Sequence, residues 1–311
     1  MKQPRTVPIS LGKVLNAFIA SALVCCSAGA ETTDNEAQPA GGNSASARAD
    51  LIINLVKKDQ LAEAGKLLSE DKERFPNDTN IMTAGAFLSY SKSMRMTDPA
   101  KRDLYLSAAV TLCQRVIEKG PSNLIANKTL GLAELAMGDS EEALTPLRRC
   151  AELDKTPENL LNLVVAMRME HPGSDEEVAS LIKQALIGDS QYMPARIEQA
   201  EFLLDQNKLK DARLALQQIP EGNRNARWLL VQGDLCSKEH DESSALAAWV
   251  AAIQLDPYFS EGYQHIANYY ASHGKTQMAE GELHRGLEVN PFNKSLRYQL
   301  SQLSRAIGHP Q

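Results

Sequence analysis

The sequence predicts an all-α fold in which short helix–turn–helix units repeat along the chain to form a solenoid. Alanine and leucine dominate its 311 residues and aromatic residues make up only 5%, which favours close-packed helices over β-sandwiches and barrels. The chain is also self-similar: small residues recur at steps of 33 to 35 residues along two ladders that lie twelve positions apart. Two ladders with the same steps indicate a repeated structural unit.

Each unit is predicted to hold two helices, one around each ladder. The upstream ladder consists of Gly131, Ala166, Ala200, Gly233 and Ala267, and the downstream ladder of Ala143, Val178, Ala212, Ala245 and Ala279. Large apolar residues follow the downstream ladder by four positions: Leu147, Ile182, Leu216, Trp249 and Leu283. Small and large residues on one helix face let a neighbouring helix approach closely while the large side chain fills the next gap.

A tight turn is predicted between the two ladders of every unit. The residues there are mostly types that tolerate a left-handed backbone: Gly138, Gly173, Asn207, His240 and Gly274. Prolines that cannot continue a helix close several of the units: Pro76, Pro121, Pro257 and Pro291.

The clearest unit spans 260–293, and it resembles the tetratricopeptide repeat (TPR) family. The family's W-x2-L-G-x2-Y, A-x3-F and P positions are occupied here by Tyr263, Ile266, Ala267, Tyr270, Gly274, Ala279, Leu283 and Pro291. The unit at 226–259 matches nearly as well, and 124–225 supplies three weaker units. The resemblance implies a right-handed superhelical solenoid of about seven TPR repeats, a scaffold that binds other proteins.

The predicted TPR array runs from 46 to 293 and contains seven repeats. Ala64 lies 45 positions before Ala109, a step of one repeat plus eleven residues, so the second repeat carries an insertion. We expect these residues to form a longer loop between its helices near 94–103. A capping helix is predicted at 294–308, where one apolar face would cover the open end of the array, formed by Leu296, Leu300, Leu303 and Ile307.

Residues 1–30 are predicted to be a cleavable secretory signal peptide. Basic residues precede an apolar run over 14–24, and small residues precede a cut after Ala30. That run is too short to span a bilayer, which needs about 20 apolar residues. The alternatives are an uncleaved anchoring helix and a lipid anchor on Cys25 or Cys26, whose preceding residues match a lipidation signal poorly. We expect an exported chain, located in the periplasm of a bacterium.

The segment at 31–45 is predicted to be a flexible leader, because it is rich in small and polar residues and holds no large apolar one. The cysteines that follow it are Cys113, Cys150 and Cys236, an odd number at wide spacing that is not a disulfide framework. We expect buried free thiols. The alternative is a single bridge between Cys113 and Cys150.

Charge and motifs argue against nucleic acid binding and against catalysis. The net charge is −6 and no basic stripe occurs that could neutralise a phosphate backbone. The sequence holds no H-E-x-x-H, G-x-S-x-G, P-loop or G-x-G-x-x-G motif, and its six histidines form no pair at ligand spacing with a third donor. We therefore predict a protein without enzymatic activity, without catalytic or metal-binding residues and without a cofactor. No stretch beyond the signal peptide is apolar enough to cross a membrane.

The TPR resemblance also implies where a partner would bind. The first helix of each repeat lines a concave groove, into which its second, fifth, ninth and twelfth positions point. The predicted partner-binding residues, almost all apolar, are Phe87, Tyr90, Lys128, Leu132, Leu135, Leu160, Leu163, Met167, Ile197 and Leu204. The last two repeats place polar residues there instead: Arg227, Asp234, Glu261, Gln264 and Asn268.

An exposed apolar groove of this size predicts a protein partner, held as a helix or an extended segment. The alternative is that a tightly wound array buries these positions itself. As a function we predict a scaffold of the cell envelope that supports pilus, exopolysaccharide-export or outer-membrane assembly. Two other functions stay open: a self-associating structural protein, and a glycan-binding accessory subunit for which Phe87 and Tyr90 are the only good aromatic candidates.

Overall fold

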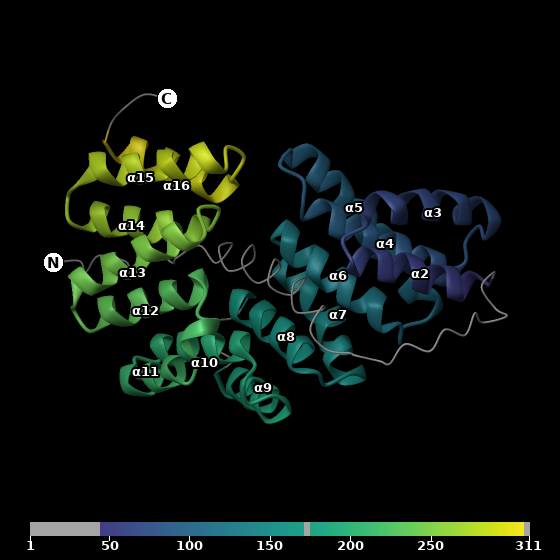
Figure 1. Cartoon of the computed structure of the whole chain (residues 1–311), viewed down its shortest axis with the longest axis horizontal. Helices are drawn as coiled ribbons and strands as arrows, with labels where there is room; N and C mark the ends of the chain where they lie inside the picture. Colours follow the sequence, from purple (N-terminus) through teal and green to yellow (C-terminus); the bar gives the residue numbers. More distant parts are fainter. Residues whose placement is uncertain (1–43, 171–174, 308–311) are drawn as a thin grey trace.

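A computed structural model describes residues 44–170 and 175–307, and these ranges fold into fifteen α-helices and one short 3-10 helix (Figure 1). The signal peptide, nearly all of the leader and Gly173 lie outside the described residues. The helices are α2 (Ala45–Lys57), α3 (Leu61–Arg74), α4 (Thr79–Ser93), α5 (Pro99–Lys119), α6 (Leu124–Met137), α7 (Ser140–Leu153), α8 (Pro157–Glu170), α9 (Asp175–Gly188), α10 (Met193–Asp205), α11 (Leu209–Gln217), η2 (Glu221–Asn223), α12 (Ala226–Lys238), α13 (Glu242–Leu255), α14 (Ser260–Ser272), α15 (Thr276–Val289) and α16 (Lys294–Ile307).

These helices form seven successive pairs followed by one final helix. Each pair, from α2 and α3 to α14 and α15, packs against the first helix of the next pair, and α16 packs on α15. The all-α repeat solenoid predicted from the sequence is therefore confirmed. Within the described part of the chain, no helix is both long and apolar enough to span a membrane.

The two helices of a pair approach most closely where the ladders face each other. A Cβ atom added to Gly131 would lie 2.4 Å from Leu147 Cγ, and one added to Gly233 would lie 2.4 Å from Trp249 Nε1. The other upstream ladder residues are alanines that are almost completely buried: Ala166, Ala200 and Ala267. The space beside the first helix is thus already filled by a large side chain of the second helix.

The inter-helix turns adopt the left-handed backbone predicted for them. The φ angles there are positive: 98° at Gly138, 56° at Asn207, 64° at His240 and 71° at Gly274. His240 therefore has a conformational role in its turn. Such residues let the chain reverse within two or three positions, which keeps the two helices of a pair in contact.

The insertion in the second repeat lies mainly in a helix. Only 94–98 separates α4 from α5, and α5 is 21 residues long where α7 has 14, which adds about two turns. The Asp98 side chain accepts hydrogen bonds from the amides of Ala100 (3.0 Å) and Lys101 (3.4 Å), and Pro99 fits the first helical turn. The prediction of a loop reaching to residue 103 is therefore wrong, because Asp98 and Pro99 together begin a helix.

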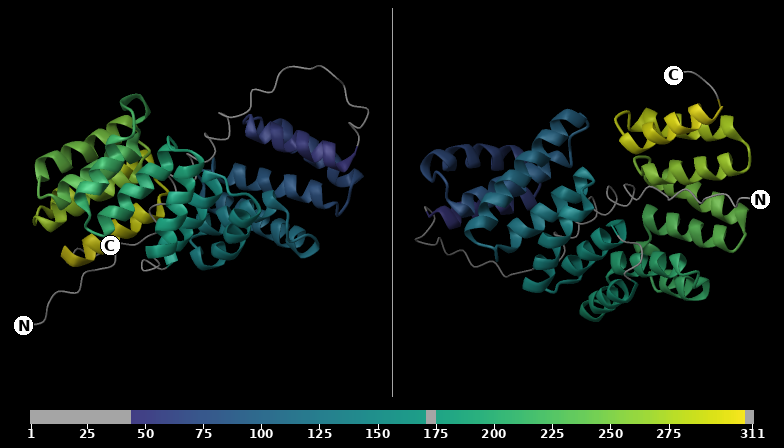
Figure 2. Two further views of the ribbon diagram at one scale, coloured as in Figure 1. Left: turned by 90° about the horizontal axis from the view of Figure 1, so that it is seen from below. Right: turned by 180° about the vertical axis from the view of Figure 1, so that it is seen from behind.

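The array curves until its end returns to the second repeat. Lys294 Nζ, at the start of α16, lies 3.2 Å from Asp103 Oδ2 in the first turns of α5. Figures 1 and 2 show the corresponding approach of α16 to α5 across the opening of the curve. First helices contact first helices of the next repeat, as in α4 with α6 and α8 with α10, so they occupy the inner side of the curve.

All three described cysteines are free and buried, so the alternative bridge between Cys113 and Cys150 does not form. Burial raises the pKa of the Cys113 thiol to about 12, with a smaller contribution from Glu134. Burial likewise raises the pKa of Cys150 to about 11. Both thiols are therefore protonated and pack as small apolar side chains.

Gly233→Ala is expected to lower the urea midpoint of unfolding, followed by far-UV circular dichroism. The added methyl group meets the rigid indole of Trp249. Overpacking of this kind destabilises a protein by about 1–3 kcal/mol, which exceeds the stabilisation of about 1 kcal/mol that alanine brings to a helix over glycine. Gly281→Ala is the matched control, since it lies inside α15 with nothing within 4 Å of the added atom. The control should raise the midpoint, and equal shifts for both variants would contradict the ladder contact.

Candidate partner-binding surface

The apolar positions predicted to line an open groove are mostly part of the core. Eight of the ten predicted residues are buried: Tyr90, Leu132, Leu135, Leu160, Leu163, Met167, Ile197 and Leu204. Only Phe87 and Lys128 keep partial exposure. The expectation that this stripe is exposed is therefore wrong, and its role in binding a partner stays a prediction.

Burial follows from how closely successive repeats stack on the inner side. Tyr90 of α4, Leu132 of α6 and Leu163 of α8 belong to one apolar cluster, which Leu106 of the lengthened α5 joins. Ile197 and Leu204 of α10 lie in a second cluster with Val231 and other residues of α11 and α12. With only 1% of Tyr90 exposed, that ring offers no platform for a sugar.

Lys128, the one charged residue of the predicted set, links two repeats. Its Nζ lies 2.7 Å from Glu158 Oε2, so α6 and α8 are joined by an ion pair whose side chains are 25% and 23% exposed. The cation is therefore already neutralised within the protein. From α8 to α14, the inner surface holds a network of charged side chains.

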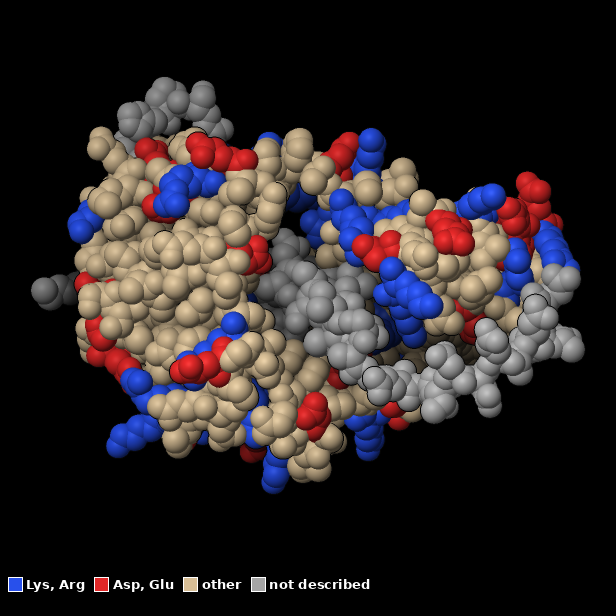
Figure 3. All heavy atoms as spheres, in the orientation of Figure 1, with Lys and Arg blue, Asp and Glu red and all other residues tan. Residues whose placement is uncertain are grey.

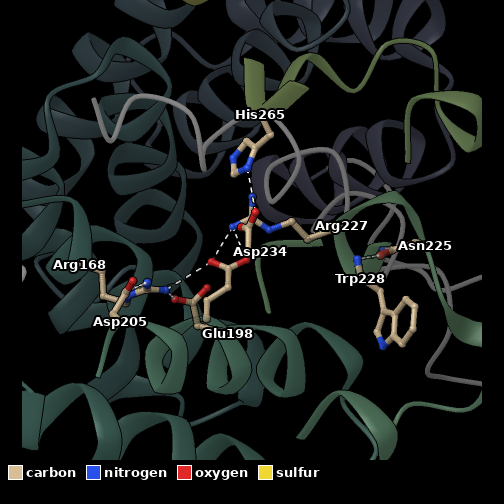
Figure 4. A network of polar contacts seen from close by, with 9 residues as sticks. Arg168, Glu198, Asp205, Asn225, Arg227, Trp228, Asp234 and His265 are labelled. Atoms are coloured by element: carbon tan, nitrogen blue, oxygen red, sulfur yellow. Dashed lines mark hydrogen bonds and ion pairs between the residues drawn. The ribbon is translucent and has the colours of Figure 1, made fainter. Parts of the chain in front are cut away.

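The network starts at Arg168 of α8, which faces three carboxylates of α10 (Figure 4). Its guanidinium pairs with Glu198, lies 3.5 Å from Glu201 Oε2 and donates to Asp205 Oδ2 at 2.5 Å. Glu201 and Asp205 follow Glu198 by about one and two helical turns on α10, so the three carboxylates share one face that a single arginine can meet. The side chain of Glu198 is only 1% exposed, whereas that of Asp205 is 65% exposed.

The network continues through Glu201 to α12 and α14. Arg227 Nη2 lies 2.5 Å from Glu201 Oε1 and 2.7 Å from its Oε2, so Glu201 lies between two arginines. Asp234 accepts a hydrogen bond from Trp249 Nε1 at 3.0 Å and lies 2.8 Å from His265 Nδ1. Figure 4 shows these groups in sequence, from Arg168 at one side through Arg227 and Asp234 to His265.

Carboxylates outnumber guanidinium groups on this inner surface. Two arginines and His265 lie among five acidic residues: Glu198, Glu201, Asp205, Asp234 and Glu261. Burial raises the pKa of Glu261, and the nearby charges of Arg227 and His265 only partly oppose that effect. Among the described residues, Glu198 Oε2 and Glu261 Oε1 are buried without a hydrogen-bond partner. The surface therefore has an excess of acceptors and of negative charge.

On the face shown in Figure 3, charged side chains are dense over α2–α5 and sparse over α12–α14. In the C-terminal repeats, several charged groups are instead gathered in the inner network described above. Uneven placement of charge on a scaffold indicates where polar recognition is possible.

The structure brings together three of the five polar inner residues expected from the sequence: Arg227, Asp234 and Glu261. The other two join the final helix to α14, because Gln264 donates to Ser295 Oγ at 2.7 Å and Asn268 accepts from Gln299 at 2.5 Å. Sequence reasoning missed the other members of the network: Arg168, Glu198, Glu201, Asp205 and His265. Of these, Glu201 occupies the same ninth position as Leu132 and Asp234, and that signal could have identified it.

Within the described ranges, no group of three or more His, Cys, Asp and Glu side chains is placed to hold a metal ion. The network also pairs most of its charges internally, as structural ion pairs do. The network therefore joins α8, α10, α12 and α14 across successive repeats.

Three solved structures illustrate what the chain is similar to. A tetratricopeptide repeat protein from Parabacteroides merdae has a TM-score of 0.64 and 14% identity, covering 83% of this chain and 99% of that one. PilW, a widely conserved type IV pilus biogenesis factor, has a TM-score of 0.54 and 13% identity, covering 69% and 94%. PilF of Pseudomonas aeruginosa has a TM-score of 0.53 and 16% identity, covering 68% and 92%. No protein-family model and no curated protein matches the chain. At these identities the likeness shows the fold.

Arg168→Met is expected to destabilise the protein by about 3–5 kcal/mol, because it leaves the buried Glu198 carboxylate without its cation. Adding Glu198→Gln to that variant should restore most of the loss. Arg148→Met is the matched control: Arg148 pairs with Glu177, both side chains are nearly half exposed, and such pairs contribute about 0–1 kcal/mol. Urea unfolding would measure all three, and equal losses in the two single variants would contradict the buried pair.

Glu261→Gln is expected to stabilise the protein near pH 7 and to have no effect below about pH 4, near the ordinary pKa of a glutamate. Because the folded state raises the pKa of Glu261, wild-type stability falls as pH rises through the ordinary value toward the raised one. Glutamine has no proton to lose and escapes that cost. Urea midpoints at several pH values would measure the difference, with the exposed Glu288→Gln as a control; a difference independent of pH would contradict the assignment.

Proposed function

We propose that this chain, which has the TPR fold, is an exported, non-catalytic scaffold that binds a segment of another protein during assembly of a cell-envelope complex. The observation that carries the proposal is the acidic network on the inner side of α8, α10, α12 and α14. Repeat solenoids use their concave surfaces for binding, and a surface with an excess of one charge sign selects a partner of the other. The partner segment is therefore basic.

The accessible part of the network is the place where such a segment makes contact. Asp205 is largely exposed, Asp234 and His265 are each 28% exposed, and Asn268 of the same inner stripe is exposed. Lysine or arginine side chains of the partner contact these groups. Glu198 and Glu261 are buried and make no contact with the partner; they influence it only through the charge or proton that each carries. The apolar stripe from Tyr90 to Leu204 then supports the curve of the array.

Two observations support a place in the cell envelope. The sequence begins with a predicted secretory signal over 1–30, and PilW, which shares the fold, is a type IV pilus biogenesis factor. A role in pilus assembly follows most directly from that likeness. Exopolysaccharide export and outer-membrane assembly are the alternatives, and all three place the mature chain in the periplasm.

Site-specific photo-crosslinking in the native cells tests this proposal. A photoreactive residue at Asp205 or at Asn268 is expected to capture one and the same protein, with less capture at high salt because the contact is ionic. The control position is Leu214 on α11, which is 56% exposed and belongs to a second helix, away from the inner surface.

Three results would overturn the proposal in different ways. Equal capture from Leu214 would place the contact elsewhere. A product of twice the chain mass would support self-association instead. Absence of any product from both inner positions, while the chain is recovered folded from the periplasmic fraction, would remove the inner surface as a binding site.

A further inference from the structure

A second surface of the molecule lies between α9 and α10, away from the inner network. A cavity of about 610 Å³ opens there, with an apolar floor that includes Ile182, Leu186 and Phe202. One stripe of each helix lines it, from Glu176 to Ile187 on α9 and from Arg196 to Leu203 on α10, with Gln206 just beyond the end of α10. We call this surface the outer groove.

The outer groove and the inner network use different faces of α10. Successive residues of an α-helix turn by about 100°, so Gln199 and Leu203 point roughly opposite to Glu201 and Asp205. The former two line the groove and the latter two belong to the network. A ligand in the outer groove therefore does not compete for space with a segment bound inside.

The groove is open because α9 and α10 pack against each other less extensively than α5 packs on α6 or α7 on α8. The next second helix, α11, has nine residues, whereas α7, α9, α13 and α15 each have fourteen. Only Lys208, just before α11, reaches the groove from that side. α9 and α10 are left with an unfilled channel about ten residues long, or about 15 Å at 1.5 Å per residue.

The floor of the groove continues into exposed apolar surface. Ile187, on the rim, is 75% exposed, and Leu186 and Leu203 beside it are only partly buried. A single exposed isoleucine needs no explanation, but a concave and mostly apolar channel of this volume with a polar rim is typical of a binding site. Inside the groove, Gln206 Oε1 is buried and has no hydrogen-bond partner among the described residues.

The rim is positively charged although the chain as a whole is acidic. Lys183, Arg196 and Lys208 border the groove with one acid, Glu176, in a protein of net charge −6. Within the described residues, none of the three cations is paired with a carboxylate; Arg196 donates to Ser190 O and to Gln199 Oε1. The rim therefore offers unneutralised positive charge to a ligand.

We propose that the outer groove binds an amphipathic α-helix of another protein, with apolar side chains on one face and carboxylates beside them. A helix fits because the channel spans about three turns and is bordered by two helices whose lining residues repeat every three or four positions. Apolar anchors at i, i+3 or i+4, and i+7 would fill the floor, and flanking carboxylates would meet Lys183, Arg196 and Lys208.

Segments of this chain fit the groove less well than a partner does. The leader sequence over 31–43 is acidic but has no large apolar residue to fill the floor. The final helix, α16, carries Lys294, Arg297 and Arg305, which have the same charge sign as the rim. Charge complementarity therefore favours a different protein with an acidic helix.

Fluorescence anisotropy with designed peptides tests the proposal on the full chain. The probe is a labelled fourteen-residue helix with leucine anchors on one face and glutamates beside them; a second peptide carries lysines in place of the glutamates, and a third has the same composition in scrambled order. The glutamate peptide is expected to bind at least tenfold more tightly than either of the others.

Variants at exposed positions locate the site. Ile187→Glu and Lys183→Glu are each expected to weaken binding of the glutamate peptide at least tenfold, and Lys183→Glu should improve binding of the lysine peptide. Leu214→Glu is the matched control, because it adds the same charge at an exposed leucine outside the groove and should change affinity little.

Each other outcome overturns the proposal. Absence of binding, equal binding of the scrambled peptide, or equal losses from Ile187→Glu and Leu214→Glu would remove the groove as an acidic-helix site. A dimer in analytical ultracentrifugation that Ile187→Glu dissociates would assign the groove to a second copy of this chain. Crosslinking from Asp205 and Asn268 should be unchanged in Ile187→Glu, so the two surfaces fail or succeed independently.

Discussion

The contact between a small residue of one helix and a large residue of the next is the constraint on which the whole array depends. At Gly131 and Gly233 no side chain fits, because Leu147 and Trp249 already occupy the space. Alanine suffices at the equivalent positions of three further repeats, where Ile182, Leu216 and Leu283 are almost completely buried. Since this contact returns every 33 to 35 residues, each pair stacks on the last in a similar way and the array curves.

Curvature in turn decides what the inner residues can be. First helices crowd together on the inner side, so their side chains either pack as core or neutralise one another across repeats. From α4 to α8 the inner side chains pack as apolar core, and Tyr90, Leu132 and Leu163 share one cluster. From α8 to α14 they form ion pairs, in which Arg168 and Arg227 join carboxylates of neighbouring helices. Buried ion pairs add little net stability over apolar packing, but they leave charge near the surface for recognition.

Features set by residues close together in the sequence could be predicted, whereas features set by contacts between repeats could not. The helix pairs and their turns follow from local residue types, such as the left-handed residues Gly138 and His240, and were predicted correctly. The length of α5 was missed because Asp98 and Pro99 are short helix-start signals inside an apparent insertion. Burial of the inner apolar stripe depends on how tightly the array winds, which no local pattern specifies. Glu201 was identifiable from its ladder position, whereas Arg168 and Glu198 gain their role only from contacts between repeats.

The two binding surfaces that we propose have opposite charge, and this difference has a consequence for specificity. α10 carries Glu198, Glu201 and Asp205 toward the inner side and Arg196 toward the outer groove. A basic segment attracted to the inner surface is repelled by the groove's rim, and an acidic helix drawn to the rim is repelled from the inner network. Like-charge repulsion thus excludes each ligand from the wrong surface, which attraction alone would not achieve. A single helix can in this way keep two different ligands apart while holding both on one scaffold.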